Sequence, residues 1–200
     1  MIATELFLTG AAATKAAIEA VCRYATAGHD PNTVAIAVDS AYTSRVADLL
    51  FGTGVGTVSV LDAAFPIWPQ ARRSIAAGAQ EIAVPLASLP DVAEIKSYLG
   101  PHTQVTLDVT TDRGLDPSAV NQALAAGVDF VSLRPDLSTP QGMLDASVLL
   151  ELAGRQDLSA VKIEAQDPQD RRLQRLFAQP QAGSLVTRSR VCLPAHDLVG

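Results

Sequence analysis

Two hydrophobic patterns alternate along the chain. Short runs rich in β-branched and apolar residues predict strands, and segments whose apolar residues recur every three or four positions predict helices. The expected strands are 6–9, 33–38, 57–61, 81–86, 104–110, 129–134, 159–165 and 184–188. The expected helices are 13–25, 42–50, 70–77, 91–99, 116–126, 142–153 and 167–178.

This order of elements predicts the fold class. A helix between two strands returns the chain to the same end of the sheet, so the strands pair in parallel. We therefore expect an α/β fold over residues 1–200, a single (β/α)8 TIM barrel domain in a short form. The segment 190–200 contains Pro194 and is too short for a full eighth helix, so the last helix is expected to be truncated. The alternative is an open, doubly wound sheet, but no Gly-x-Gly-x-x-Gly motif follows any strand.

One lysine lies inside a strand pattern. In the segment 159–165, Val161 and Ile163 share one face, and Lys162 and Glu164 share the other. Lysine is seldom buried unless it forms an ion pair or has a catalytic role. One interpretation is an ion-paired polar layer that fills the barrel. The other is an amine whose pKa is altered by burial and by neighbouring charges, with Glu164 opposing the effect of burial, and which attacks a carbonyl or moves a proton.

Chemistry in a TIM barrel takes place at the C-terminal ends of the strands. The polar side chains expected there from strands five to seven are Thr106, Asp108, Ser132, Arg134, Lys162 and Glu164. Strand eight adds Thr187, Arg188, Ser189 and Arg190, and Asp39 and Asp62 follow strands two and three. His29 and His102 are expected at the opposite end and His196 in the tail, so a Ser/His/Asp triad is not expected.

Composition narrows the choice of partner. The net charge is −6 and the pI about 4.9, which argues against nucleic acid. No run of about 18 apolar residues and no signal peptide pattern is present, so we expect a cytoplasmic protein without a membrane partner. Two distant cysteines, Cys22 and Cys192, give neither a disulfide framework nor a metal-binding spacing.

Five segments, in order, resemble the deoxyribose-phosphate aldolase family. They are residues 12–14 with 18–22, Phe65-Pro66, residues 78–82, residues 127–131, and Val161-Lys162. The resemblance implies a TIM barrel, aldol cleavage through a Schiff base without a cofactor, and a small phosphorylated carbonyl compound as ligand. Assembly with further copies of the same chain, as a homo-oligomer, is left open.

The chain departs from the family at its functional positions. Ser132 stands where the family carries its Schiff-base lysine, and Ala83 where it carries an aspartate for proton transfer. Ala165-Gln166 replaces the Gly-Gly that helps to hold the substrate phosphate. Lys162 matches the second lysine of the family, which tunes the first. The resemblance therefore predicts a divergent member with lost or altered aldolase activity that keeps a phosphate and carbonyl pocket.

The alternative is an active lyase in which Lys162 is the nucleophile. The catalytic candidates are then Lys162, Asp108 and Glu164, and the substrate-binding candidates are Ser132, Arg134, Thr187, Arg188, Ser189 and Arg190. A Mg²⁺-dependent lyase using Asp39, Asp62, Asp108 and Glu164 is a third hypothesis, although we expect neither a metal nor a cofactor. Trp68, the single tryptophan, either caps the pocket or packs on a helix.

Overall fold

Eight parallel strands close into a barrel in the computed structural model of the protein, which describes residues 3–28, 31–99, 101–111, 113–155, 160–165, 172 and 185–190. Around the barrel the strands follow the order β1, β10, β9, β8, β5, β4, β3 and β2. Their bounds are β1 Ala3–Leu8, β2 Thr33–Asp39, β3 Gly56–Val60, β4 Glu81–Pro85, β5 Gln104–Asp108, β8 Phe130–Leu133, β9 Ala160–Ala165 and β10 Leu185–Arg190. The predicted (β/α)8 barrel is confirmed, and the open sheet is excluded.

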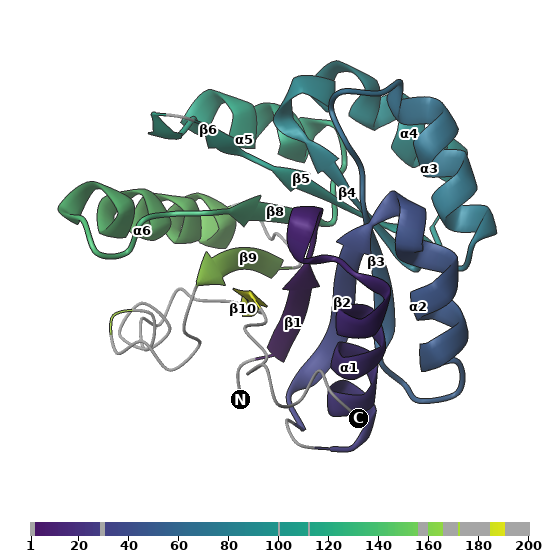
Figure 1. Cartoon of the computed structure of the whole chain (residues 1–200). Coiled ribbons are helices and arrows are strands. Elements are labelled where there is room, and N and C mark those ends of the chain that lie inside the picture. Colours follow the sequence, from purple (N-terminus) through teal and green to yellow (C-terminus); the bar gives the residue numbers. More distant parts are fainter. Residues whose placement is uncertain are drawn as a thin grey trace.

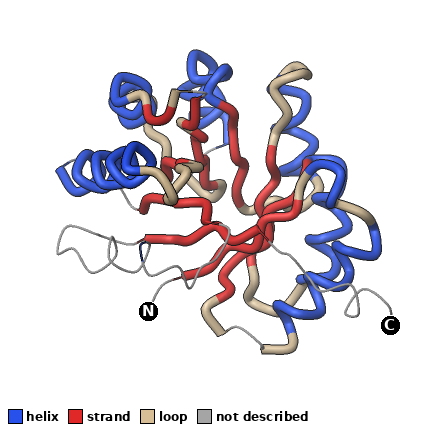
Figure 2. The backbone as a smooth tube through the Cα atoms, turned by 60° about the vertical axis from the view of Figure 1, so that its left-hand side comes forward, coloured by secondary structure: helices blue, strands red, loops and turns tan. Residues whose placement is uncertain are grey.

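The helices form an outer layer around the strands, as Figures 1 and 2 show. They are η1 Gly10–Ala12, α1 Lys15–Thr26, η2 Ser40–Tyr42, α2 Thr43–Leu50, α3 Ile67–Ala76, η3 Leu86–Asp91, α4 Val92–Leu99, α5 Pro117–Ala125 and α6 Pro140–Arg155. Within the described residues, no helix is both long and apolar enough to cross a bilayer. The helix expected at 167–178 lies outside the described residues except for the helical Arg172, and so does the expected last helix.

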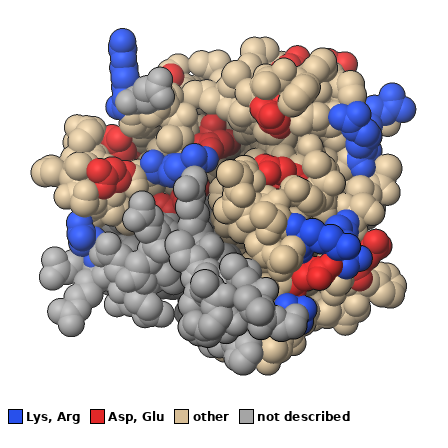
Figure 3. Space-filling view, in the orientation of Figure 1, with Lys and Arg blue, Asp and Glu red and all other residues tan. Residues whose placement is uncertain are grey.

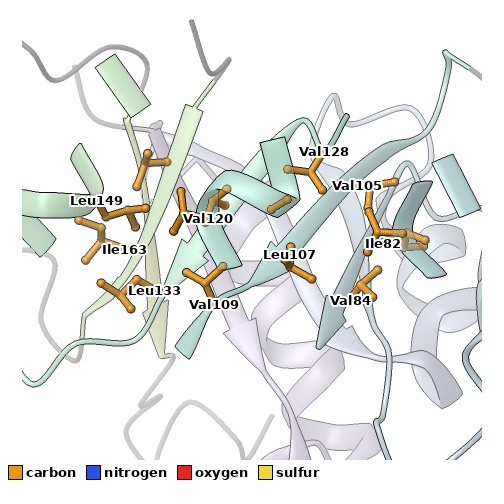
Figure 4. Packing of buried hydrophobic residues seen from close by; sticks show 14 of the residues in the cluster. Ile82, Val84, Val105, Leu107, Val109, Val120, Val128, Leu133, Leu149 and Ile163 are labelled. Carbon is orange, nitrogen blue, oxygen red and sulfur yellow. The ribbon is translucent and has the colours of Figure 1, made fainter. Parts of the chain in front are cut away.

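The main core lies between the outer face of the barrel and the helices (Figure 4). Val161 and Ile163 of β9 belong to it, as the alternation of the strand predicts. The strands also contribute Ile82, Val84, Val105, Leu107 and Leu133, and the helices contribute Val120 and Leu149. Because these side chains point outward, the alternate residues of the same strands point into the lumen.

Capping side chains mark the first turns of two helices. The side chain of Thr14 accepts a hydrogen bond from the backbone N–H of Ala17, and Asp116 caps α5 in the same way, with Pro117 in the first turn. The helix predicted to begin at Gln70 instead begins at Ile67. Pro69 is tolerated there because the first turn of a helix has N–H groups without an intrahelical partner.

A small antiparallel hairpin after β5 was not predicted. Thr110–Thr111 (β6) pairs with Gly114–Leu115 (β7), whereas the pattern of residues 104–110 predicts one continuous strand. Asp145 of α6 accepts a hydrogen bond from the backbone N–H of Leu115 at 3.2 Å. Gly114 has a φ of +97°, and a Cβ built there would lie 2.1 Å from Oδ2 of Asp145.

We predict that Gly114→Ala lowers the free energy of unfolding more than Gly127→Ala. Both glycines have positive φ, which costs a residue with a Cβ about 1–3 kcal/mol, but a Cβ at Gly127 meets no atom within 4 Å. Only Gly114→Ala forces Asp145 away from Leu115. Urea denaturation of the two variants checks this, and equal losses of stability would contradict the role of Asp145.

Candidate functional site

The lumen of the barrel contains a small apolar cluster and a buried charged cluster. Phe7, Ala35, Ala37, Val58 and Ala83 pack together inside it. Three of these are alanines, and their small side chains leave volume for longer ones from other strands. Lys162 of β9 occupies part of this volume, so the lysine points inward as the alternation of the strand predicts.

Lys162 is held between two carboxylates. Its Nζ lies 2.5 Å from Oε2 of Glu5, 2.5 Å from Oε1 of Glu81 and 2.6 Å from Oε2 of Glu81. The exposed fractions of these three residues are only 2%, 1% and 5%. A lysine ammonium has three N–H donors, and carboxylate oxygens accept from it here at all three contacts. In this position Nζ is hydrogen-bonded to carboxylate oxygens from two other strands.

Two further side chains complete this cluster. The hydroxyl of Thr106 donates a hydrogen bond of 2.6 Å to Oε1 of Glu81. The ring centre of Phe130 lies 4.6 Å from Nζ of Lys162, within the range of a cation–π contact. Glu81 and Phe130 are the first residues of β4 and β8, so the ammonium lies toward the N-terminal ends of the strands.

A small cavity of about 240 Å³ reaches this cluster from the N-terminal end of the barrel. Glu5, Glu81, Phe130 and Lys162 line it together with residues at the starts of β2, β3 and β5. The active sites of TIM barrels lie at the other end. The head group of Lys162 is therefore on the side away from the end where chemistry is expected.

At the C-terminal end, Arg134 is fixed by two other carboxylates. Its Nε lies 2.9 Å from Oε2 of Glu164, and one terminal nitrogen lies 3.3 Å from Oδ2 of Asp108. Its backbone N–H donates to the hydroxyl of Thr110 at 2.9 Å. The side chain of Arg134 is still 46% exposed, so part of the guanidinium faces the solvent. The sequence had paired Glu164 with Lys162, but Glu164 pairs with Arg134.

Arg134 also lines a cavity of about 650 Å³ at this end, which we call the mouth cavity. Its other walls come from the ends of β1, β2 and β3, from the loop before α3 and from α3 itself. They include Phe7, Asp39, Val60, Leu61, Asp62, Phe65, Gln70 and Arg73. On the face seen in Figure 3, basic and acidic side chains lie next to each other near the centre. The mouth cavity thus combines an apolar floor with charged groups of both signs.

Comparison with known proteins establishes the fold and no closer relation. No family model and no curated protein matches the chain. Among solved structures, it is similar to a protein described as a deoxyribose-phosphate aldolase from Coccidioides immitis, with a TM-score of 0.71 and 15% identity over 94% of this chain and 80% of that one. The deoxyribose-phosphate aldolase from Aeropyrum pernix gives 0.66 and 18% over 92% and 84%. A HpcH/HpaI aldolase/citrate lyase family protein from Burkholderia cenocepacia gives 0.69 and 18% over 94% and 88%.

The remaining candidates fall in different places. Ser132 is buried in the lumen, in register with Asp108 on one side and Lys162 on the other. The residues Thr187, Arg188, Ser189 and Arg190 belong to β10, and their side chains lie outside the described part of the chain.

No three described His, Cys, Asp or Glu side chains are grouped as metal ligands. Burial raises the pKa of the Cys22 thiol to about 11.

Gln70 is a residue of the mouth that the sequence analysis missed. Its Nε2 donates to the carbonyl oxygens of Asp62 and Phe65, at 2.8 and 3.1 Å, and its Oε1 accepts from the N–H of Asp62 at 2.9 Å. It is 2% exposed, on the inner side of α3. A glutamine on the buried side of an amphipathic helix was the available signal. Its contacts hold the loop between β3 and α3 against the barrel.

We predict that Gln70→Leu lowers the free energy of unfolding by about 1–3 kcal/mol, because backbone groups of Asp62 and Phe65 lose buried partners. The matched control is Gln122→Leu, since the side chain of Gln122 is exposed and donates to the hydroxyl of Ser118 on its own helix. Chemical denaturation of both variants measures the difference. A loss no larger than that of the control would show that Gln70 does not hold the loop.

Proposed function

We propose that this barrel is an aldolase-like protein that binds a small phosphorylated carbonyl compound in its mouth cavity and forms no imine with it. The observation that carries the proposal is the burial of Lys162 between Glu5 and Glu81. A Schiff base requires a neutral amine with free access to a carbonyl. Ser132, at the position where the resembled family carries its reactive lysine, cannot supply one.

The mouth cavity supports binding of an anionic ligand. Arg134 is half-exposed, and Asp108 and Glu164 hold its guanidinium in a fixed orientation. A planar guanidinium held in place can donate two parallel hydrogen bonds to a phosphate. Arg73, on α3, lines the same cavity and adds a second positive charge. We assign the phosphate to these two arginines, and the side chains of β10 remain candidates to extend the site.

We predict that deoxyribose 5-phosphate binds to the parent chain and that Arg134→Gln weakens binding about tenfold or more, since a hydrogen bond to a charged group contributes about 1.5–3 kcal/mol. The affinity of the Arg134→Lys variant should lie between the affinities of the parent chain and of Arg134→Gln. The control is Arg45→Gln, which breaks a surface ion pair with Glu19, because neither residue lines the mouth cavity. Isothermal titration calorimetry measures the affinities. No binding by the parent chain, or equal loss in the control, would refute the mouth as the site.

The absence of an imine is tested separately. We expect that borohydride reduction in the presence of deoxyribose 5-phosphate or acetaldehyde adds no mass to the peptide that carries Lys162, because Nζ of Lys162 is buried and held by Glu5 and Glu81. Intact mass and peptide mapping provide the readout. A reduced adduct on Lys162, together with retro-aldol turnover that disappears in Lys162→Met, would support the active lyase instead.

A further inference from the structure

A second cavity lies on the outer surface, between α3 and α4, which run side by side in Figure 1. Its lining residues are Trp68, Pro69, Arg72 and Arg73 of α3 and Glu94 and Tyr98 of α4, and its volume is about 620 Å³. We call it the aromatic groove. The proposed function makes no use of it, apart from Arg73.

The aromatic rings of this groove are fixed against each other. Trp68 and Tyr98 form an edge-to-face pair, with 5.4 Å between ring centres and 82° between ring planes. The guanidinium of Arg72 lies 5.8 Å from the centre of the Tyr98 ring. Trp68 packs on the main core, while Tyr98 is 58% exposed. Trp68 therefore packs on a helix, which is one of the two interpretations that the sequence left open, and the ring of Tyr98 beside it is exposed to a ligand.

The groove also carries positive charge available to a ligand. Arg72 and Arg73 are both exposed, and neither forms an ion pair with a described residue. Guanidinium groups without a protein carboxylate are suited to bind phosphate oxygens. Glu94, one helical turn before Tyr98, places a carboxylate at the other side of the groove. It repels phosphate, but it can accept hydrogen bonds from amino or hydroxyl groups.

Arg73 connects the two cavities, because it lines both the aromatic groove and the mouth cavity. The volume of the groove, about 620 Å³, is within the range of small-molecule pockets. This volume, with an aromatic pair beside two exposed arginines, favours a small ligand over a macromolecule.

We propose that the aromatic groove binds a nucleoside phosphate. Its planar base stacks on one ring of the edge-to-face pair of Trp68 and Tyr98, its phosphate contacts Arg72 and Arg73, and Glu94 accepts hydrogen bonds from its amino or hydroxyl groups. The site shares Arg73 with the mouth cavity, and its other residues belong to the groove alone. It does not require the mouth cavity to bind deoxyribose 5-phosphate, so either proposal can fail without the other.

The single tryptophan of the chain reports directly on this groove. We expect ADP to quench Trp68 fluorescence saturably, with excitation at the red edge of tryptophan absorption and free tryptophan as the control for light absorbed by adenine. Adenosine lacks the phosphate, so it should bind about tenfold more weakly or worse. Deoxyribose 5-phosphate has no base and should leave the emission almost unchanged, even if it binds in the mouth.

Charge variants locate the phosphate. Arg72→Gln and Arg73→Gln should each weaken ADP binding about tenfold, whereas Arg23→Gln, an exposed arginine on α1, should not change it. Unchanged Trp68 emission at millimolar ADP, or equal affinities in all three variants, would overturn the proposal. Emission that depends on protein concentration and not on ADP would also overturn it, by showing that a second copy of the chain occupies the groove.

Discussion

The interaction on which this account depends is the ion pair of Lys162 with Glu5 and Glu81 inside the lumen. It joins three strands, β9, β1 and β4, no two of which are neighbours in the barrel, so it acts across the lumen rather than between two hydrogen-bonded strands. Burying charges is costly unless opposite charges and hydrogen bonds accompany them. The alanines of β2 and β4 leave the room that these long side chains need. The charged cluster and the small apolar cluster therefore fill the lumen of the barrel together.

This arrangement separates the charged groups of the barrel into two levels. Lys162 forms ion pairs with Glu5 and Glu81 near the N-terminal ends of the strands, away from the mouth cavity. Arg134 is oriented by Asp108 and Glu164 at the C-terminal ends, where solvent and ligands have access. A fold shared with aldolases thus places its lysine where it contributes to packing and its arginine where it can bind an anion.

The sequence predicted the fold well because each element has a strong local signal. The alternation around Lys162 placed it in the lumen, and the strand–helix order predicted the closed barrel. The partners of Lys162 were not predictable, because Glu5 and Glu81 are 157 and 81 residues away and their own strands gave no sign of pairing. Gln70 was missed for a similar reason, since its role depends on a loop whose path the sequence does not show. The hairpin at 110–115 was hidden because its first strand continues the pattern of β5.

A double-mutant cycle on Lys162 and Glu81 tests the central claim most directly. The free energy of unfolding is measured for the parent chain, Lys162→Met, Glu81→Gln and the double variant. Lys162→Met alone should cost about 3–5 kcal/mol because it leaves carboxylates buried without their cation. The double variant should then be more stable than the sum of the single losses predicts, by about 1–3 kcal/mol. Losses that add to within about 0.5 kcal/mol would mean that the two side chains do not interact, and would contradict the account.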